Sequence, residues 1–278
     1  MSLPLEAATR VGFITGTRDQ QEAREIATRA EALGYDSLWT GDHIAFTLPV
    51  LDPLLQLAQM ATASERLLLG TSVFLLPLRH PVLAAKQATS VAVLTGNRFG
   101  FGVGLSPWPD DFRVLNVPWK GRGKRLDEAI EIIRGLETGE FFEFHGEHFD
   151  LEPIKLCPAP TERIPILIGG HADAALRRAA RVGDGWMHAG GGEAQDFDAA
   201  MVRIAELRKE YGREKEPFEV HVISMDAYTP DGIRKLEDKG VTDCIVGFRN
   251  GYAEDTMPLE KKLDAIRGYA DNVIAKVG

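Results

Sequence analysis

The chain has 278 residues, of which 44% are hydrophobic and 26% charged, and its formal net charge is −9 at pH 7. This length fits a single α/β barrel of about 250 residues, and the hydrophobic content excludes an intrinsically disordered chain. Because an acidic surface repels a phosphate backbone, we expect no nucleic-acid partner.

The two cysteines and the distribution of apolar residues indicate the cellular setting. Cys157 and Cys244 lie far apart and form no CxxC pair, so neither a disulfide framework nor a zinc site is predicted. No apolar run approaches the roughly 18 residues of a membrane-spanning helix, and the first eight residues lack the basic and apolar parts of a leader peptide. We therefore expect a cytoplasmic protein without a membrane partner or a bound metal.

Short apolar runs alternate with amphipathic segments along the whole chain. The first amphipathic segment begins with Asp19 and Glu22, which have the spacing of a capping box, and Gly34 ends it in a favoured position. The predicted strands cover residues 11–15, 35–39, 67–73, 99–103, 165–168, 185–188, 218–223 and 243–248. The predicted helices cover about residues 20–33, 53–61, 81–95, 126–136, 173–182, 195–210, 230–239 and 259–275.

Eight βα units in strict alternation predict a parallel sheet, and this number favours a closed (β/α)8 TIM barrel over an open, doubly wound sheet. Residues 104–119 are predicted to be a loop. Residues 139–163 interrupt the alternation with a predicted hairpin, which is an insertion after the fourth strand and not a linker. The chain is thus expected to form one domain over residues 1–278.

In such a barrel the active site lies in the loops after the strands. Asp42 and His43 follow the second strand; an imidazole can exchange a proton with a reacting oxygen, and the carboxylate can orient it or bind a polar ring edge. A helix cap beside a structural histidine is the alternative interpretation. Gly169, Gly170, His171 and Ala172 lie between a strand and a helix, where free backbone N–H groups can receive a phosphate, although a simple left-handed turn would have the same pattern.

Several stretches resemble the luciferase-like monooxygenase superfamily. They are LGYDSLWTGDH (33–43), RLLLGTSV (66–73), HPVLAAK (80–86), NRFGFGVG (97–104), ILIGG (166–170) and GDGW (183–186), and together they extend over nearly the whole chain in order. Within the superfamily the chain is most similar to oxidoreductases that depend on coenzyme F-420, the 8-hydroxy-5-deazaflavin. The resemblance implies a TIM barrel with an insertion after strand 4.

The resemblance also implies roles for individual residues. Asp42 would bind the deazaflavin ring, and His43 would lie near its reactive carbon. Ser72 and Val73 would form a bulge, often with a non-prolyl cis peptide, that backs the ring. The cofactor phosphate would be held by Gly169, Gly170, His171 and Ala172.

The chain departs from the deazaflavin enzymes at two positions. Several of them carry a Glu directly after the glycines of strand 4, where this chain has Leu105 and Ser106, which leaves Asp110 or Asp111 as a replacement acid. They also tend to carry a Trp shortly after the histidine, where this chain has Phe46. The substrate can therefore differ from the sugar phosphates and alcohols used in the family.

The sequence-based hypothesis is hydride transfer between the deazaflavin and a small organic substrate, with His43 as general acid or base. An FMN-dependent monooxygenase is the alternative enzyme, and a barrel that carries a flavin or deazaflavin without catalysis is the alternative outside enzymology. A small-molecule substrate is the expected partner, and a homodimer stays open.

Overall fold

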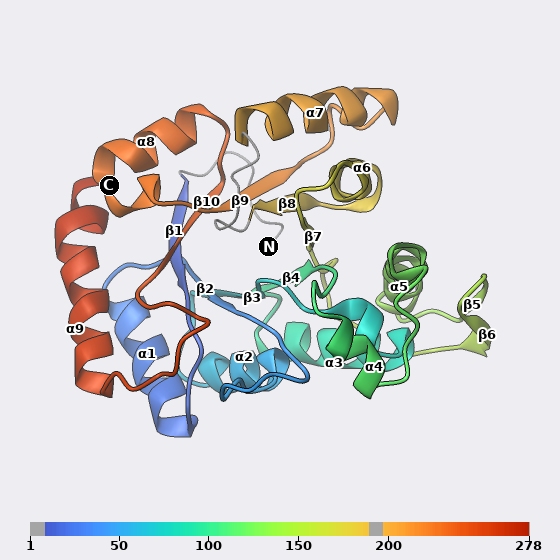
Figure 1. Ribbon diagram of the computed structural model, residues 1–278, viewed down its shortest axis with the longest axis horizontal. Helices are drawn as coiled ribbons and strands as arrows, with labels where there is room; N and C mark the ends of the chain where they lie inside the picture. The colour runs from blue at the N-terminus through green and yellow to red at the C-terminus, as the bar shows by residue number, and fades with distance from the viewer. Residues whose placement is uncertain (1–8, 189–196, 278) are drawn as a thin grey trace.

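The computed structural model describes residues 9–188 and 197–277, and its centre is a closed barrel of parallel strands (Figure 1). The strands follow one another around the barrel in the order β1-β10-β9-β8-β7-β4-β3-β2, with β1 paired to both β10 and β2. The barrel strands are β1 (Arg10–Ile14), β2 (Ser37–Thr40), β3 (Leu68–Thr71), β4 (Phe99–Val103), β7 (Ile166–Gly169), β8 (Gly185–His188), β9 (Glu219–Ile223) and β10 (Asp243–Gly247). The predicted TIM barrel is confirmed, and the open sheet is excluded.

Helices surround the barrel on the outside (Figure 1). The main helices are α1 (Gln20–Ala32), α2 (Pro53–Ala61), α3 (Pro81–Leu94), α5 (Arg122–Leu136), α6 (Asp173–Val182), α7 (Phe197–Glu210), α8 (Pro230–Asp238) and α9 (Leu259–Tyr269). The capping box predicted before α1 is present in part: the N-cap Asp19 accepts from the N–H of Glu22, but the Glu22 carboxylate accepts from the N–H of Arg18, one residue before the N-cap. After α9 the chain continues through a π-helical turn (Ala270–Ile274) into α10 (Ala275–Val277), where one continuous helix was predicted.

Two features interrupt the alternation after β4. A short helix, α4 (Pro109–Val114), lies within the segment predicted to be a loop, because Pro109 and two acidic residues suit a first helical turn. The predicted hairpin is present as the antiparallel pair β5 (Phe142–His145) and β6 (Asp150–Ile154), which projects from one side of the molecule (Figure 1).

The barrel interior is filled around Trp39, which is fully buried on β2. A Cβ atom at Gly70 would lie 2.1 Å from the indole ring, and one at Gly100 would lie 3.1 Å from it. The glycines of β3 and β4 therefore make room for the large side chain of Trp39. The indole packs in a cluster with Leu68, Leu167, Met187 and Ile245.

A charged layer closes the end of the barrel where the strands begin. Arg10, Glu219 and Asp243 are the first residues of their strands, and Arg10 pairs with both carboxylates. Ser37 donates to Asp243 (3.0 Å), and His221 contacts Glu219 at 2.5 Å. Burial raises the pKa of Glu219, but His221 and Arg10 outweigh it, so this pKa lies below its usual value. None of the helices in residues 9–188 and 197–277 is long and apolar enough to cross a membrane.

Candidate active site

His43 follows β2 at the opposite end of the barrel, where the strands finish. Its ring stacks on Phe46, with centroids 4.2 Å apart and planes 13° apart. Nδ1 is enclosed without a hydrogen-bond partner, and within residues 9–188 and 197–277 no hydrogen bond is made by Nε2. Burial lowers the pKa of His43, and the negative charges of Asp111 and Asp42 oppose this only in part. The imidazole is therefore neutral near pH 7 and able to accept a proton.

Asp42, beside it, is almost completely buried. Its carboxylate accepts two hydrogen bonds from the Arg79 guanidinium and one from the N–H of Leu75 (2.8 Å). Arg79 also lies 3.6 Å from Asp52 and over the ring of Phe74. The carboxylate thus fixes the segment after β3, and its predicted contact with the deazaflavin ring stays a prediction.

The peptide bond between Ser72 and Val73 is cis, directly after β3. The Val73 side chain packs against two glycines at the ends of neighbouring strands: Cβ atoms at Gly104 or Gly169 would each lie 2.6 Å from it. Gly169 is therefore required for packing, a role that the sequence did not indicate. The cis bond that the resemblance implies is present, while its role of backing a ring remains a prediction.

The segment before α6 joins a glycine of positive φ to a helix N-terminus. Gly170 has φ of 120°, where a side chain would be strained, and its carbonyl accepts from the indole N–H of Trp186 at 2.8 Å. Ala172 is the N-cap of α6 and offers no side-chain cap, so the first N–H groups of the helix are not capped by it. This placement fits the predicted phosphate-binding segment without testing it.

Two histidines stand together beside this segment. The rings of His171 and His188 have centroids 4.7 Å apart, and each has one enclosed nitrogen without a partner. Burial lowers the pKa of both, and for His188 the neighbouring His171 lowers it further. His188, the last residue of β8, was missed in the sequence, although a histidine at the end of a barrel strand is itself a signal.

Asp110 and Asp111, the two acids that the sequence offers in place of the missing Glu, lie in different surroundings. Asp111 is buried and accepts from the Ser106 hydroxyl (2.6 Å) and from the N–H of Ala45 (2.9 Å), which ties α4 to the loop of His43. Asp110 is exposed and pairs with Arg113 on the same helix. Of the two, only Asp111 acts on the charge of His43.

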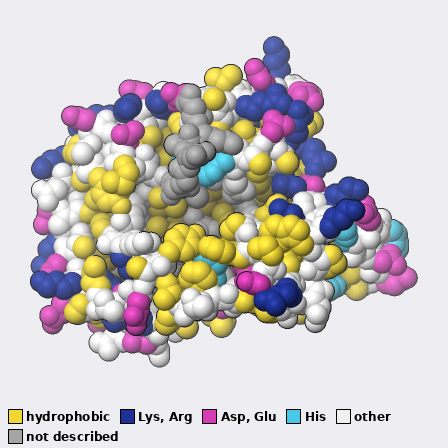
Figure 2. Space-filling model, in the orientation of Figure 1, with side chains coloured by type: hydrophobic (Ala, Val, Ile, Leu, Met, Phe, Trp, Pro, Cys, Tyr) yellow, Lys and Arg dark blue, Asp and Glu magenta, His cyan; other side chains and the backbone are white. Residues whose placement is uncertain are grey.

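Trp108 and Tyr252 were not among the predicted site residues. Their rings lie 6.3 and 6.0 Å from the ring of His43, and they come from the loops after β4 and β10. The Pro- and Trp-rich loop after strand 4 was a signal for Trp108, whereas nothing local marked Tyr252. Figure 2 shows hydrophobic and histidine side chains gathered around the middle of this face.

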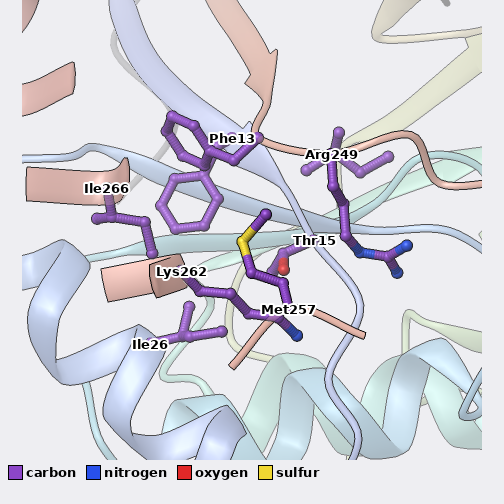
Figure 3. A pocket seen from close by; sticks show the side chains of 9 residues that line it. Phe13, Thr15, Ile26, Arg249, Met257, Lys262 and Ile266 are labelled. Atoms are coloured by element: carbon purple, nitrogen blue, oxygen red, sulfur yellow. The ribbon is translucent and has the colours of Figure 1, made fainter. Parts of the chain in front are cut away.

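A small space lies between β1, α1 and α9, where Met257 and Lys262 reach in between Phe13 and Ile26 (Figure 3). Its volume is about 20 Å³, enough for about one water molecule and far below the several hundred Å³ of a cofactor site. Lys262 pairs there with Glu22 and Asp255. This buried ion cluster anchors the loop that carries Tyr252.

Comparison with known proteins agrees with this architecture. The model of the luciferase-like monooxygenase family matches residues 6–238. A Mycobacterium tuberculosis protein described as uncharacterized is 49% identical over 91% of this chain and 94% of its own length. A coenzyme F-420-dependent glucose-6-phosphate dehydrogenase of Beutenbergia cavernae is 30% identical over 85% of this chain and 74% of its own.

Among solved structures, the monooxygenase RslO1 from Streptomyces bottropensis superimposes with a TM-score of 0.82 at 19% identity, covering 97% of this chain and 100% of that one. At this identity the likeness speaks for the fold, and it agrees with the closed barrel. The family model spans most of the chain, so the resemblance found in the sequence is confirmed. The chain belongs to the luciferase-like monooxygenase family.

Proposed function

We propose that this chain is an oxidoreductase that exchanges a hydride between coenzyme F-420 and a small organic substrate, with His43 as the general acid or base. The observation that carries the proposal is the state of His43: a half-buried, neutral imidazole at the barrel mouth whose nitrogens have no partner in the described part of the chain. The 30% identity to an F-420-dependent glucose-6-phosphate dehydrogenase supports the choice of cofactor.

The residues present fit a phosphorylated, flat cofactor. His171 follows Gly170 in the chain and its ring lies 4.7 Å from that of His188, so an anion bound at this segment would receive imidazole donors together with backbone N–H groups. We assign the phosphate to residues 169–172 with His188, and the ring to the bulge at Ser72 and Val73. Asp42 would reach the edge of the deazaflavin ring, but its carboxylate is already bound by Arg79. We therefore assign Asp42 chiefly to positioning the segment after β3.

The chain's own contribution to the reaction is proton transfer and orientation. When bound, the deazaflavin supplies the hydride chemistry. In the oxidation of an alcohol, Nε2 of His43 takes the hydroxyl proton while the carbon gives up its hydride; in the reduction of a carbonyl the same nitrogen returns the proton. The stacking on Phe46 holds the imidazole plane in place in both directions of the reaction.

A pair of titrations and one variant test this proposal. Purified protein is titrated with coenzyme F-420 and with FMN, and binding is followed by absorbance and fluorescence, since the two ring systems absorb differently. We expect F-420 to bind, and we expect His43→Ala to lower the single-turnover rate by about 10²–10⁴-fold while cofactor affinity is kept.

Each other outcome selects an alternative. Binding of FMN without F-420 would instead support the flavin-dependent monooxygenase suggested by the family name and by RslO1. Binding of F-420 with no turnover over a panel of alcohols and ketones would support a carrier. A His43→Ala variant that turns over at the wild-type rate would refute the assigned mechanism.

A further inference from the structure

Three aromatic side chains from three different loops surround His43. Phe46 lies in the loop after β2, Trp108 in the loop after β4, and Tyr252 in the loop after β10. Trp108 and Tyr252 lie 6.3 and 6.1 Å from the ring of Phe46, besides their contacts with His43. We call Phe46, Trp108 and Tyr252 the mouth cluster. In the part of the chain that the structure describes, no ring contact joins Trp108 to Tyr252, so both face the His43–Phe46 pair independently.

The aromatic rings of the mouth cluster are partly exposed to solvent. Trp108 is 42% exposed and Tyr252 is 66% exposed, while Phe46 is half-buried beside them. Scattered exposed apolar residues are ordinary, but aromatic rings gathered at a concave functional face are typical of a ligand site. The imidazole of His43, with its Nε2, is the ring that all three aromatic side chains contact. A ligand that covers the rings would bring a polar atom to that nitrogen.

The one basic side chain of the three loops that carry the mouth cluster is already paired. The loops at residues 41–52, 104–108 and 248–258 contain a single basic residue, Arg249. Arg249 lies 3.7 Å from Asp255 and donates to the carbonyls of Asn250 and Ala253. Arg79, from the loop after β3, is bound to the Asp42 carboxylate. A phosphate or carboxylate on the substrate would therefore find no unpaired guanidinium or ammonium among these loops.

The carboxylates of the same loops do not offer a cation site either. Asp42 is held by Arg79 and Leu75, and Asp255 is held by Lys262 and Arg249. Only the exposed Glu254 and the half-buried Asp52 lie nearer to solvent, and Asp52 caps α2. Apart from the exposed Glu254, the three loops thus combine aromatic rings, one neutral imidazole and paired charges.

We propose that the substrate of this site is an uncharged molecule whose apolar part packs against Phe46, Trp108 and Tyr252, with one oxygen facing Nε2 of His43. The reaction that follows rests on the proposed function, but the binding preference does not. In this proposal the mouth cluster determines specificity. Phe46 packs against both the imidazole and the ligand, and Trp108 and Tyr252 cover the apolar part of the ligand.

The test compares probes that share a phenyl ring and differ in charge. Acetophenone is neutral, phenyl phosphate is anionic and benzyltrimethylammonium is cationic; cyclohexanone serves as a second neutral probe. Binding is measured by calorimetry and by tryptophan emission, in which the Trp108→Phe variant separates the contribution of Trp108 from those of Trp39, Trp119 and Trp186. We expect a neutral probe to bind at least tenfold more tightly than either charged one.

Variants locate the binding. Phe46→Ala and Tyr252→Ala should each weaken the neutral probe about three- to tenfold, the range of one aromatic contact, and Phe46→Trp should retain its affinity. Trp108→Phe should abolish most of the change in emission. Phe141→Ala removes an equally exposed aromatic residue (74%) from the segment before β5 and should change nothing. Circular dichroism confirms that each variant is folded.

The outcomes separate this inference from the proposed function. If a neutral probe binds through the mouth cluster but F-420 does not bind, the cofactor assignment fails and the binding preference stands. If F-420 binds, yet no neutral probe exceeds the charged ones with or without it, the inference is overturned. Neutral binding that Phe46→Ala and Tyr252→Ala leave unchanged also overturns it, because the ligand then sits elsewhere.

Discussion

Asp42 supports the barrel mouth as an ion-pair partner, and Asp42→Asn tests how much of the fold depends on it. The Asp42 side chain is 1% exposed and that of Arg79 is 15% exposed, so the pair is largely removed from water. Loss of one charge leaves the guanidinium buried without its main counter-ion and weakens the acceptor of the Leu75 N–H. Breaking such a pair costs about 3–5 kcal/mol of unfolding free energy.

The expected shift in melting temperature follows from chain length. At about 2.1 cal/mol/K per residue, the unfolding entropy of 278 residues is about 0.6 kcal/mol/K, so Asp42→Asn should lower Tm by about 5–9 °C. Calorimetry of Asp42→Asn, Arg79→Met and the double variant gives the coupling between them, and the double variant should be less destabilised than the two singles predict together. A Tm within about 1 °C of the wild type would show that the pair contributes little and that Asp42 is free to serve the cofactor alone.

Three other predictions concern proton transfer, phosphate binding and the core. In the oxidation direction kcat/KM should fall as pH falls through a pKa below the usual value of about 6.5, and Asp111→Asn should move that limb to still lower pH, as a pH profile would show. Gly170→Val should weaken cofactor binding in a titration while circular dichroism stays unchanged. Asp243→Asn should lower the unfolding free energy in urea by about 3–5 kcal/mol, because Arg10 loses a buried partner.

The strands could be predicted because each one carries its own signal. The run at residues 67–73 is apolar without alternation, as burial on both faces requires, and β3 forms within it. The helix at residues 109–114 was missed because six residues hold too few apolar positions to show a period. The break after Tyr269 was missed for a related reason, since a π-helical turn keeps a helical composition.

The candidate site was predictable only where position and chemistry coincide in one short segment. His43 is an imidazole directly after a strand, so both signals are local. Arg79 was absent from the predicted site because its partner lies 37 residues earlier, and only the closed barrel brings the two loops together. The position of Tyr252 near His43 likewise depends on the pairing of β10 with β1 and on the ion pair between Lys262 and Asp255.

The two ends of the barrel differ in whether their buried polar groups lie beside opposite charges, and this difference bears on where the chemistry occurs. At the end where strands begin, Arg10 and Ser37 bind Asp243, and His221 binds Glu219, so buried charge is matched by buried charge.

At the end where strands finish, His43, His171 and His188 each keep an enclosed nitrogen without a partner, although an unmade buried hydrogen bond costs about 1–3 kcal/mol. At the end where strands begin, the buried His221 also keeps Nδ1 without a hydrogen bond, but its Nε2 contacts Glu219 and carboxylates lie on both sides of its ring. We propose that ligands use the remaining hydrogen-bonding capacity of the three imidazoles at the mouth, with Nε2 of His43 facing the substrate, and His171 and His188 lying next to the cofactor phosphate.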